Sequence, residues 1–481
     1  MSANKLPSRI SLPFLFPIAI LVAVTLGTAA SQLSQTIALS PWEPAIAMEA
    51  VRLNTGLPLY DSTHATHLYG PLLTVTLAGV FQITGLNLIA ARVVMSLFGG
   101  ALVILLSAIL CRGKPAICWV IAVLLFFGIN LRTNLILFSI QPDWAAALIA
   151  TVALYFWITR RNSWLRLGVS VALFVCATLF KQTAAAFAGV PIVYVVLWKR
   201  RWKFRELITS FIPATSILLG LMAIRLGSPQ MFAAIVSIPA AIKVYPERAL
   251  SIALYLFVTF PVFLVALWSV WPSRNSLSEI ERWLFSALVV FVPISIWITC
   301  KSGSGFNSLL FAYLSMTALF VARLPTIFDR LRAIPIWQSL VAAIGIGLAV
   351  LISFFWQFDR DVKLLSLRHG DNKYGAVVSI ARGLNGLVVA PQDPTIPYRA
   401  KKYFGRSLFF ELDTHAVNGN WPNELPVSLL QELQRANHVI TVRGYVPTPL
   451  FERSLPQIGF DQVSFPELRD SVYTVWSKPP Q

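Results

Sequence analysis

The chain has 481 residues, of which 56% are hydrophobic and only 12% are charged, and its mean hydropathy is +0.69. Soluble globular domains carry about 25% charged residues, so this composition excludes a soluble protein and indicates a polytopic membrane protein. The net charge of +18 does not indicate nucleic acid as a partner. Most Lys and Arg residues lie in short clusters between apolar segments, as in the loops of membrane proteins.

About eleven apolar segments are predicted to cross the membrane as helices, although several are short for a span. They lie at residues 10–30, 90–111, 115–130, 144–159, 167–180, 184–198, 206–226, 249–271, 281–300, 308–323 and 336–358. With this count the basic clusters fall on one side of the bilayer, which the positive-inside rule assigns to the cytoplasm. The N-terminus is then cytoplasmic and the C-terminal segment extracytoplasmic. Residues 1–358 form the transmembrane module of a mainly α-helical bundle.

The first outer loop, residues 31–89, groups acidic residues that are scarce elsewhere, namely Glu43, Glu49 and Asp61. A carboxylate near lipid is costly unless it is used, so this loop is predicted to carry the function. After Tyr69-Gly70-Pro71, the apolar run to Thr84 is too short for a span and is expected to lie on the membrane surface. Residues 230–243 are predicted to form a similar surface segment.

Some residues of this loop also have structural interpretations. Ser40 and Glu43, with Pro41 between them, fit the pattern of a helix capping box, which is compatible with a catalytic Glu43. His64 and His67 have a spacing that a helix could use to hold a metal, but no third ligand is identified.

The last part of the chain, residues 359–481, is richer in charge and is predicted to form a small extracytoplasmic α/β domain. Residues 386–390 and 438–442 are predicted to be buried parallel strands, residues 425–436 an amphipathic helix, and residues 471–477 a final strand. No phosphate-binding glycine motif occurs here, so an accessory role is expected.

Several stretches together resemble the GT-C glycosyltransferases, in particular bacterial relatives of protein O-mannosyltransferases and the lipid A aminoarabinose transferase. They are the loop from Glu43 through Gly56 and Tyr60 to Tyr69-Gly70-Pro71, then Ala90-Ala91-Arg92, Gln141-Pro142-Asp143 and Phe180-Lys181-Gln182-Thr183. The resemblance covers roughly residues 10–400. It implies an enzyme of the bacterial plasma membrane that uses a polyprenyl-phosphate-linked sugar on the outer face. The family pattern usually has two adjacent acids in the loop, and here Trp42 stands at the first position.

Sugar transfer from a lipid phosphate needs a base near the attacking hydroxyl and positive charge near the leaving phosphate. Glu43, assisted by Asp143, is the predicted base of an inverting displacement. Basic residues on the predicted outer face are Arg92, Arg132, Lys181, Arg225, Lys243, Arg248 and Lys301. Of these, Lys181, Lys301 and Arg92 are the predicted phosphate-binding residues. The substrate-cavity candidates are Tyr60, His64, His67, Tyr69, Gln182 and Asn307.

The expected partners are the lipid-linked sugar donor, membrane lipids and an acceptor that is a glycan, a lipid or a protein. A divalent metal ion stays open as a cofactor. Two other functions also stay open at this stage: a transporter or lipid flippase, and a non-catalytic partner in the assembly of cell-envelope glycans. Against the transporter, the two halves of the chain show no repeat.

Overall fold

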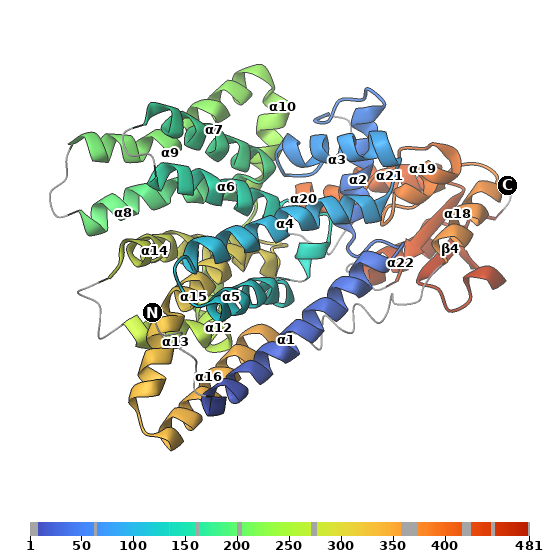
Figure 1. The fold of residues 1–481 in the computed structure, drawn as a ribbon. Helices are drawn as coiled ribbons and strands as arrows, with labels where there is room; N and C mark the ends of the chain where they lie inside the picture. The colour runs from blue at the N-terminus through green and yellow to red at the C-terminus, as the bar shows by residue number, and fades with distance from the viewer. Residues whose placement is uncertain are drawn as a thin grey trace.

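A computed structural model of the chain describes residues 8–61, 65–133, 135–159, 163–199, 204–270, 277–356, 373–415, 425–443 and 448–479. A bundle of helices makes up most of the molecule, and a unit with a small sheet lies at one end of it (Figure 1). The first loop lies at the same end as this unit.

Six helices in the described residues are long and apolar enough to cross a membrane, as expected for an integral membrane protein. They are α1 (Ser8–Ser34), α4 (Leu88–Leu110), α9 (Phe204–Gly227), α14 (Glu279–Thr299), α15 (Leu310–Ala333) and α16 (Ile336–Phe355). A seventh span forms if α12 (Ala249–Thr259) and α13 (Val262–Val270) count as one helix bent by 79°.

Shorter apolar helices occupy the other predicted spans. They are α5 (Ala116–Gly128) with η1 (Ile129–Arg132), α6 (Asp143–Ile158), α7 (Trp164–Phe180), and η3 (Gln182–Gly189) with α8 (Val190–Trp198). Every predicted span is therefore helical, and the mainly helical membrane fold is confirmed. The length criterion counts up to seven spans rather than about eleven, because a helix of 16 residues is only about 24 Å long and the hydrocarbon core is about 30 Å thick.

The first loop contains α2 (Trp42–Asn54) and α3 (Pro71–Thr84). Helix α3 has the predicted bounds, because Pro71 pre-forms its first turn and Gly85, with φ of 66°, ends it. The second predicted surface segment is also helical and consists of α10 (Pro229–Phe232), η4 (Ala233–Ser237) and α11 (Ile238–Ala241). The remaining short turns are η2 (Ile136–Phe138), η5 (Pro246–Arg248) and η7 (Phe306–Leu309).

The C-terminal segment has helices on a four-stranded sheet. Its elements are α18 (Tyr374–Gly383), β1 (Val388–Val389), α19 (Thr395–Lys401), α20 (Leu408–His415), α21 (Val427–Arg435), β2 (His438–Val442), α22 (Thr448–Gln457), β3 (Asp461–Val463), η9 (Pro466–Leu468) and β4 (Tyr473–Ser477). The strand order is β1-β2-β4-β3. The predicted parallel pair β1 and β2 is confirmed, and β4 pairs with β2 in the antiparallel direction. The sequence did not predict β3, which is short and exposed. The predicted boundary at residues 358/359 lies outside the described residues, so the division into domains stays a prediction.

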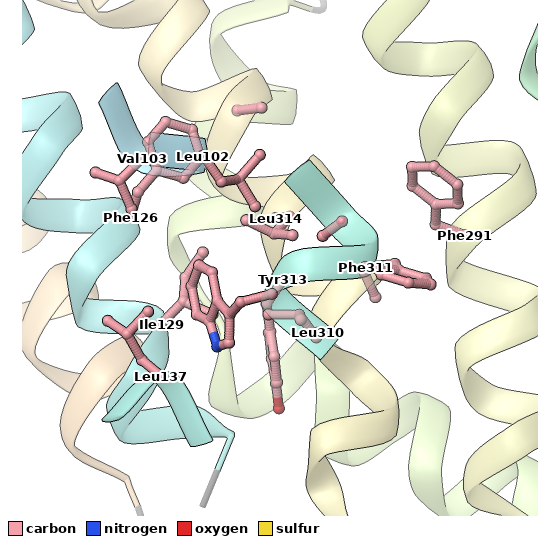
Figure 2. Close-up of a cluster of buried hydrophobic side chains, with 14 of the residues drawn as sticks. Leu102, Val103, Phe126, Ile129, Leu137, Phe291, Leu310, Phe311, Tyr313 and Leu314 are labelled. Carbon is pink, nitrogen blue, oxygen red and sulfur yellow. The ribbon is translucent and has the colours of Figure 1, made fainter. Parts of the chain in front are cut away.

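Two hydrophobic cores follow this arrangement. One fills the helical bundle and gathers side chains of α4, α5, η1 and α15 (Figure 2). The other lies around the sheet. Helices α19 and α20 pack against α2, and the Trp42 side chain contacts both cores. The first loop and the C-terminal segment therefore lie on the same side of the bundle.

Candidate functional site

Asp143 and Lys181 form a buried ion pair at the ends of two adjacent helices. Asp143 is the first residue of α6, where the positive end of the helix dipole favours a carboxylate, and Lys181 directly follows the last residue of α7. The Lys181 Nζ atom lies 2.6 Å from Oδ1 of Asp143. The other oxygen, Oδ2, is buried and accepts no hydrogen bond from any described residue. One oxygen of this carboxylate therefore has unused hydrogen-bonding capacity within the described residues.

The first loop lies directly on this pair. The Lys181 ammonium is 5.4 Å from the centre of the Tyr69 ring, which is a cation–π distance. Gln182 Nε2 donates to the Leu68 carbonyl oxygen at 2.8 Å. A Cβ atom at Gly70 would lie 2.0 Å from the carbonyl oxygen of Leu179, so only glycine permits this approach. The Tyr-Gly-Pro and Lys-Gln motifs of the sequence thus meet in space.

His67 and Tyr60 hold Tyr69 in place. The Tyr60 hydroxyl donates to the Tyr69 carbonyl oxygen at 2.7 Å. The Tyr69 N–H donates to Nδ1 of His67 at 3.2 Å, so the proton of the neutral ring is assigned to Nε2, which donates to the Thr74 hydroxyl. Burial lowers the pKa of His67 to about 4, which keeps this ring uncharged.

The residues do not fit the metal site that the His64–His67 spacing suggested. Both ring nitrogens of His67 are engaged, and His64 lies outside the described residues. Within the described ranges no three His, Cys, Asp or Glu side chains lie close enough together to hold one ion.

Glu43 is fully buried and accepts four hydrogen bonds. Its donors are the Leu39 N–H at 2.6 Å, the Ile140 N–H at 3.0 Å, and Nε and Nη2 of Arg92 at 3.1 and 2.7 Å. A carboxylate has about four lone-pair positions, so its hydrogen-bonding capacity is filled. The alternative of a capping box is not borne out. Helix α2 begins at Trp42 without a side-chain cap, and the buried Ser40 hydroxyl has no partner among the described residues.

Arg92 is also fully buried, and each of its five N–H groups has an acceptor. Two donate to Glu43, and the others donate to the carbonyl oxygens of Gln32, Gln35 and Ile37. The pair therefore fastens the end of α1, the start of α2 and helix α4 to one another. The bond from Ile140 extends this network to the segment that leads into Asp143.

Lys301 and Asn307 belong to a second group of residues around α11 and η7. The half-buried Lys301 ammonium donates to the Pro239 carbonyl oxygen at 2.6 Å, and burial lowers the pKa of this group. Asn307 lies in η7. Within the described ranges, the hydrogen bonds of Lys301 connect it to α11 and to its own loop rather than to Lys181.

The structure adds two residues that were not among the predicted site residues. Arg132 is fully buried between the rings of Tyr255 and Tyr313, at 5.4 and 5.2 Å. Its Nε and Nη1 atoms find no acceptor in the described part of the chain. Asp413 of α20 accepts a hydrogen bond from the Trp42 indole N–H at 3.2 Å. The sequence marked Arg132 only as a basic residue of the outer face and gave no signal for Asp413.

No protein-family profile matches the chain, and no curated protein matches its sequence. The solved structures similar to it include two GT-C glycosyltransferases. ArnT from Cupriavidus metallidurans bound to undecaprenyl phosphate aligns at a TM-score of 0.56 and 13% identity, over 96% of this chain and 99% of ArnT. The apo oligosaccharyltransferase of Archaeoglobus fulgidus aligns at 0.51 and 12%, over 92% of this chain and 70% of its own. The chain therefore has the fold of these transferases, and the resemblance seen in the sequence is confirmed at the level of the fold.

Proposed function

We propose that the chain is a membrane glycosyltransferase that moves a sugar from a polyprenyl phosphate to an acceptor hydroxyl on the outer face of the bacterial plasma membrane. The fold shared with ArnT and the oligosaccharyltransferase supports the reaction class. The undecaprenyl phosphate bound to ArnT supports the class of donor. The contact between the first loop and the C-terminal segment supports a site on one face of the membrane.

The proposal depends most on the free Oδ2 atom of Asp143. This atom takes the proton of the acceptor hydroxyl while the acceptor oxygen attacks the anomeric carbon. The bond from that carbon to the phosphate oxygen breaks, and the lipid phosphate leaves with the bonding electron pair. One displacement of this kind inverts the configuration of the sugar carbon. Lys181 offsets the negative charge of Asp143 through the ion pair.

Glu43, which the sequence analysis predicted as the base, acts in this scheme as a positioning residue together with Arg92. Its oxygen atoms are occupied by four N–H groups, so a substrate hydroxyl would have to displace one of them. The hydrogen bond from the Ile140 N–H connects Glu43 to the segment that leads into Asp143. We assign to Glu43 the orientation of this segment.

The positive charge for the leaving phosphate is assigned to Lys301 and Arg132. Neither side chain pairs with a carboxylate in the described residues. The Tyr255 ring connects the surroundings of Arg132 to the group of residues around η7. It lies 5.4 Å from the Arg132 guanidinium and 5.1 Å from the ring of Phe306, the neighbour of Asn307 in η7. An anion near these unpaired cations would offset the cost of their burial.

The test uses the full-length protein in membranes with a polyprenyl phosphate that carries a radiolabelled hexose. Transfer predicts that free polyprenyl phosphate and a labelled acceptor appear together, and that Asp143→Asn prevents both. Movement of the intact lipid-linked sugar across vesicles, without release of lipid phosphate, would instead support a flippase. Absence of both activities would support a non-catalytic partner.

A further inference from the structure

Helix α20 of the C-terminal segment is attached to the first loop by two phenylalanine rings. Phe409 lies 5.0 Å from the Trp42 ring, and Phe410 lies 6.1 Å from the His67 ring, both measured between ring centres. Both phenylalanines are buried. Phe410 belongs to the core of the helical bundle, whereas Phe409 belongs to the core around the sheet. The helix is therefore fixed against the loop by packing.

Asp413 follows these rings on α20 and faces the same loop. Its carboxylate accepts the hydrogen bond of the Trp42 indole. Asp413, Trp42 and Tyr69 are half-buried, whereas His67 and the two phenylalanines below them are buried. A carboxylate and two aromatic rings, all partly exposed, thus lie next to buried aromatic side chains.

This group of three is close to the Asp143–Lys181 pair. Tyr69 covers the Lys181 ammonium. Burial raises the pKa of the Tyr69 hydroxyl, and the negative charges of Asp143 and Asp413 raise it further. The Tyr69 hydroxyl therefore interacts electrostatically with both carboxylates, Asp143 of α6 and Asp413 of the C-terminal segment.

We propose that Asp413 is a substrate-binding residue of the transferase site, where its carboxylate accepts hydrogen bonds from the hydroxyl groups of a sugar ring that packs against Trp42 and Tyr69. This inference rests on the proposed function. Binding sites are commonly lined by aromatic side chains with a few polar groups that fix the orientation of the ligand. The described residues give Asp413 one hydrogen bond, from Trp42, and its other oxygen is the one assigned to the ligand.

The protonation of Asp413 gives this role a pH signature. Burial raises the pKa of Asp413 to about 6, and the hydrogen bond from Trp42 opposes that rise. Most charged groups on the elements around α20 are paired with others: Glu43 with Arg92, Arg52 with Asp61, Glu411 with Arg406 and Ser428, and Glu432 with Tyr403 and the Arg406 N–H. Glu49 of α2 has no ion pair within the described residues, and burial raises its pKa to about 8. The other titratable groups that face Asp413 are Tyr69 and the neutral His67.

The experiment measures KM and kcat separately for the labelled donor and for the acceptor. A hydrogen bond to a charged group contributes about 1.5–3 kcal/mol, so Asp413→Ala is expected to raise one of the two KM values roughly 10- to 100-fold. A higher donor KM places the donor sugar on Asp413, and a higher acceptor KM places the acceptor there. Asp413→Asn keeps the shape of the side chain and one acceptor oxygen, so a smaller increase in the same KM is expected. This variant replaces Asp413→Ala in the experiment if the alanine variant fails to fold. Asp461→Asn, on the exposed strand β3, is the matched control and should change neither KM.

The pH profile separates binding from a structural role. In the wild type the affected KM should rise as the pH falls below about 6. Trp42→Phe removes the bond that favours the carboxylate and should move this midpoint to higher pH, and Asp413→Asn should abolish the dependence. Unchanged KM values and an unchanged profile in an active Asp413→Ala protein would overturn the inference and leave the proposed function intact. A lower yield of folded protein with normal KM would also overturn it. Absence of transfer by the wild type would overturn both proposals.

Discussion

Two buried ion pairs beside the first loop differ in how completely they are satisfied. Glu43 and Arg92 have no free hydrogen-bonding capacity, since four N–H groups reach the carboxylate and five acceptors surround the guanidinium. Asp143 and Lys181 share one bond, and the second carboxylate oxygen is free of any described donor. A saturated pair fixes the architecture, whereas an unsaturated buried pair is stable only if something else uses it. This difference supports the proposal in which Glu43 has a structural role and Asp143 acts in the chemistry.

The type of basic residue fits this difference. An arginine offers five donors in a fixed plane and can join several carbonyl oxygens at once, as Arg92 does. A lysine is a flexible point charge, and Lys181 uses one of its N–H groups on Asp143. Its other N–H groups, which donate to no described residue, lie beside the Tyr69 ring.

Removal of the unsaturated Asp143–Lys181 pair should have the largest effect, which is a lower rate of sugar transfer. The double variant Asp143→Asn/Lys181→Met leaves no uncompensated charge, so the protein should fold and stay monodisperse in detergent. Its rate of lipid phosphate release should fall by roughly 10²- to 10⁴-fold, as for loss of a general base. Release at the wild-type rate by this double variant would remove Asp143 from the chemistry.

Disruption of the saturated Glu43–Arg92 pair should have the second largest effect, which is a loss of stability. Glu43→Gln leaves the Arg92 guanidinium buried without its counter-charge, which costs about 3–5 kcal/mol. We expect a clearly lower Tm and less folded protein in membranes, measured by thermal unfolding of the detergent-solubilised protein. The activity of each remaining folded molecule should fall less than in the Asp143 variant. A fully stable but inactive Glu43→Gln protein would exchange the roles of the two acids.

The sequence predicted the helices of this site better than the hydrogen bonds and packing contacts between them. The apolar runs located the helices, and Pro71, Lys181 and Asp143 marked helix ends that the structure has at those residues. The saturation of Glu43 could not be predicted, because two of its donors, the Leu39 and Ile140 N–H groups, belong to irregular backbone whose position depends on tertiary packing. Asp413 was missed for the same reason, since no local pattern reports that α20 packs on a loop near residue 42.

Glu49 is another acid of the first loop, and it has no close ion pair within the described residues. Burial raises its pKa to about 8, Arg52 lowers it and Asp61 raises it. The unfolded chain releases this proton near the ordinary glutamate pKa of 4.5, whereas the folded protein keeps it until about pH 8. The folded state thus binds more protons in this window, and its stability falls as the pH rises.

Glu49→Gln should remove this loss. At 1.36 kcal/mol per pKa unit, it should stabilise the protein at pH 7 by at most about 3 kcal/mol, and by much less near pH 4.5. The measurement is Tm against pH for both proteins. His67 has the opposite sign, because its lowered pKa costs stability as the pH falls from 6.5 to about 4. Parallel Tm profiles for wild type and Glu49→Gln would show that Glu49 is ionised in the folded state.

The variant with the smallest expected effect, Gly70→Ala, tests whether the first loop must lie directly on the Asp143–Lys181 pair. In Gly70→Ala the added carbon would lie 2.0 Å from the Leu179 carbonyl oxygen, so the loop has to move, at a cost of about 1–3 kcal/mol for overpacking. Tyr69 would move away from Lys181 with it, and transfer should slow although the catalytic residues are intact. Gly79→Ala in α3 is the control, because nothing lies within 4 Å of a Cβ there and alanine favours a helix. Equal activity in both variants would mean that the contact between Gly70 and α7 serves packing alone, since the chemistry would then tolerate a displaced Tyr69.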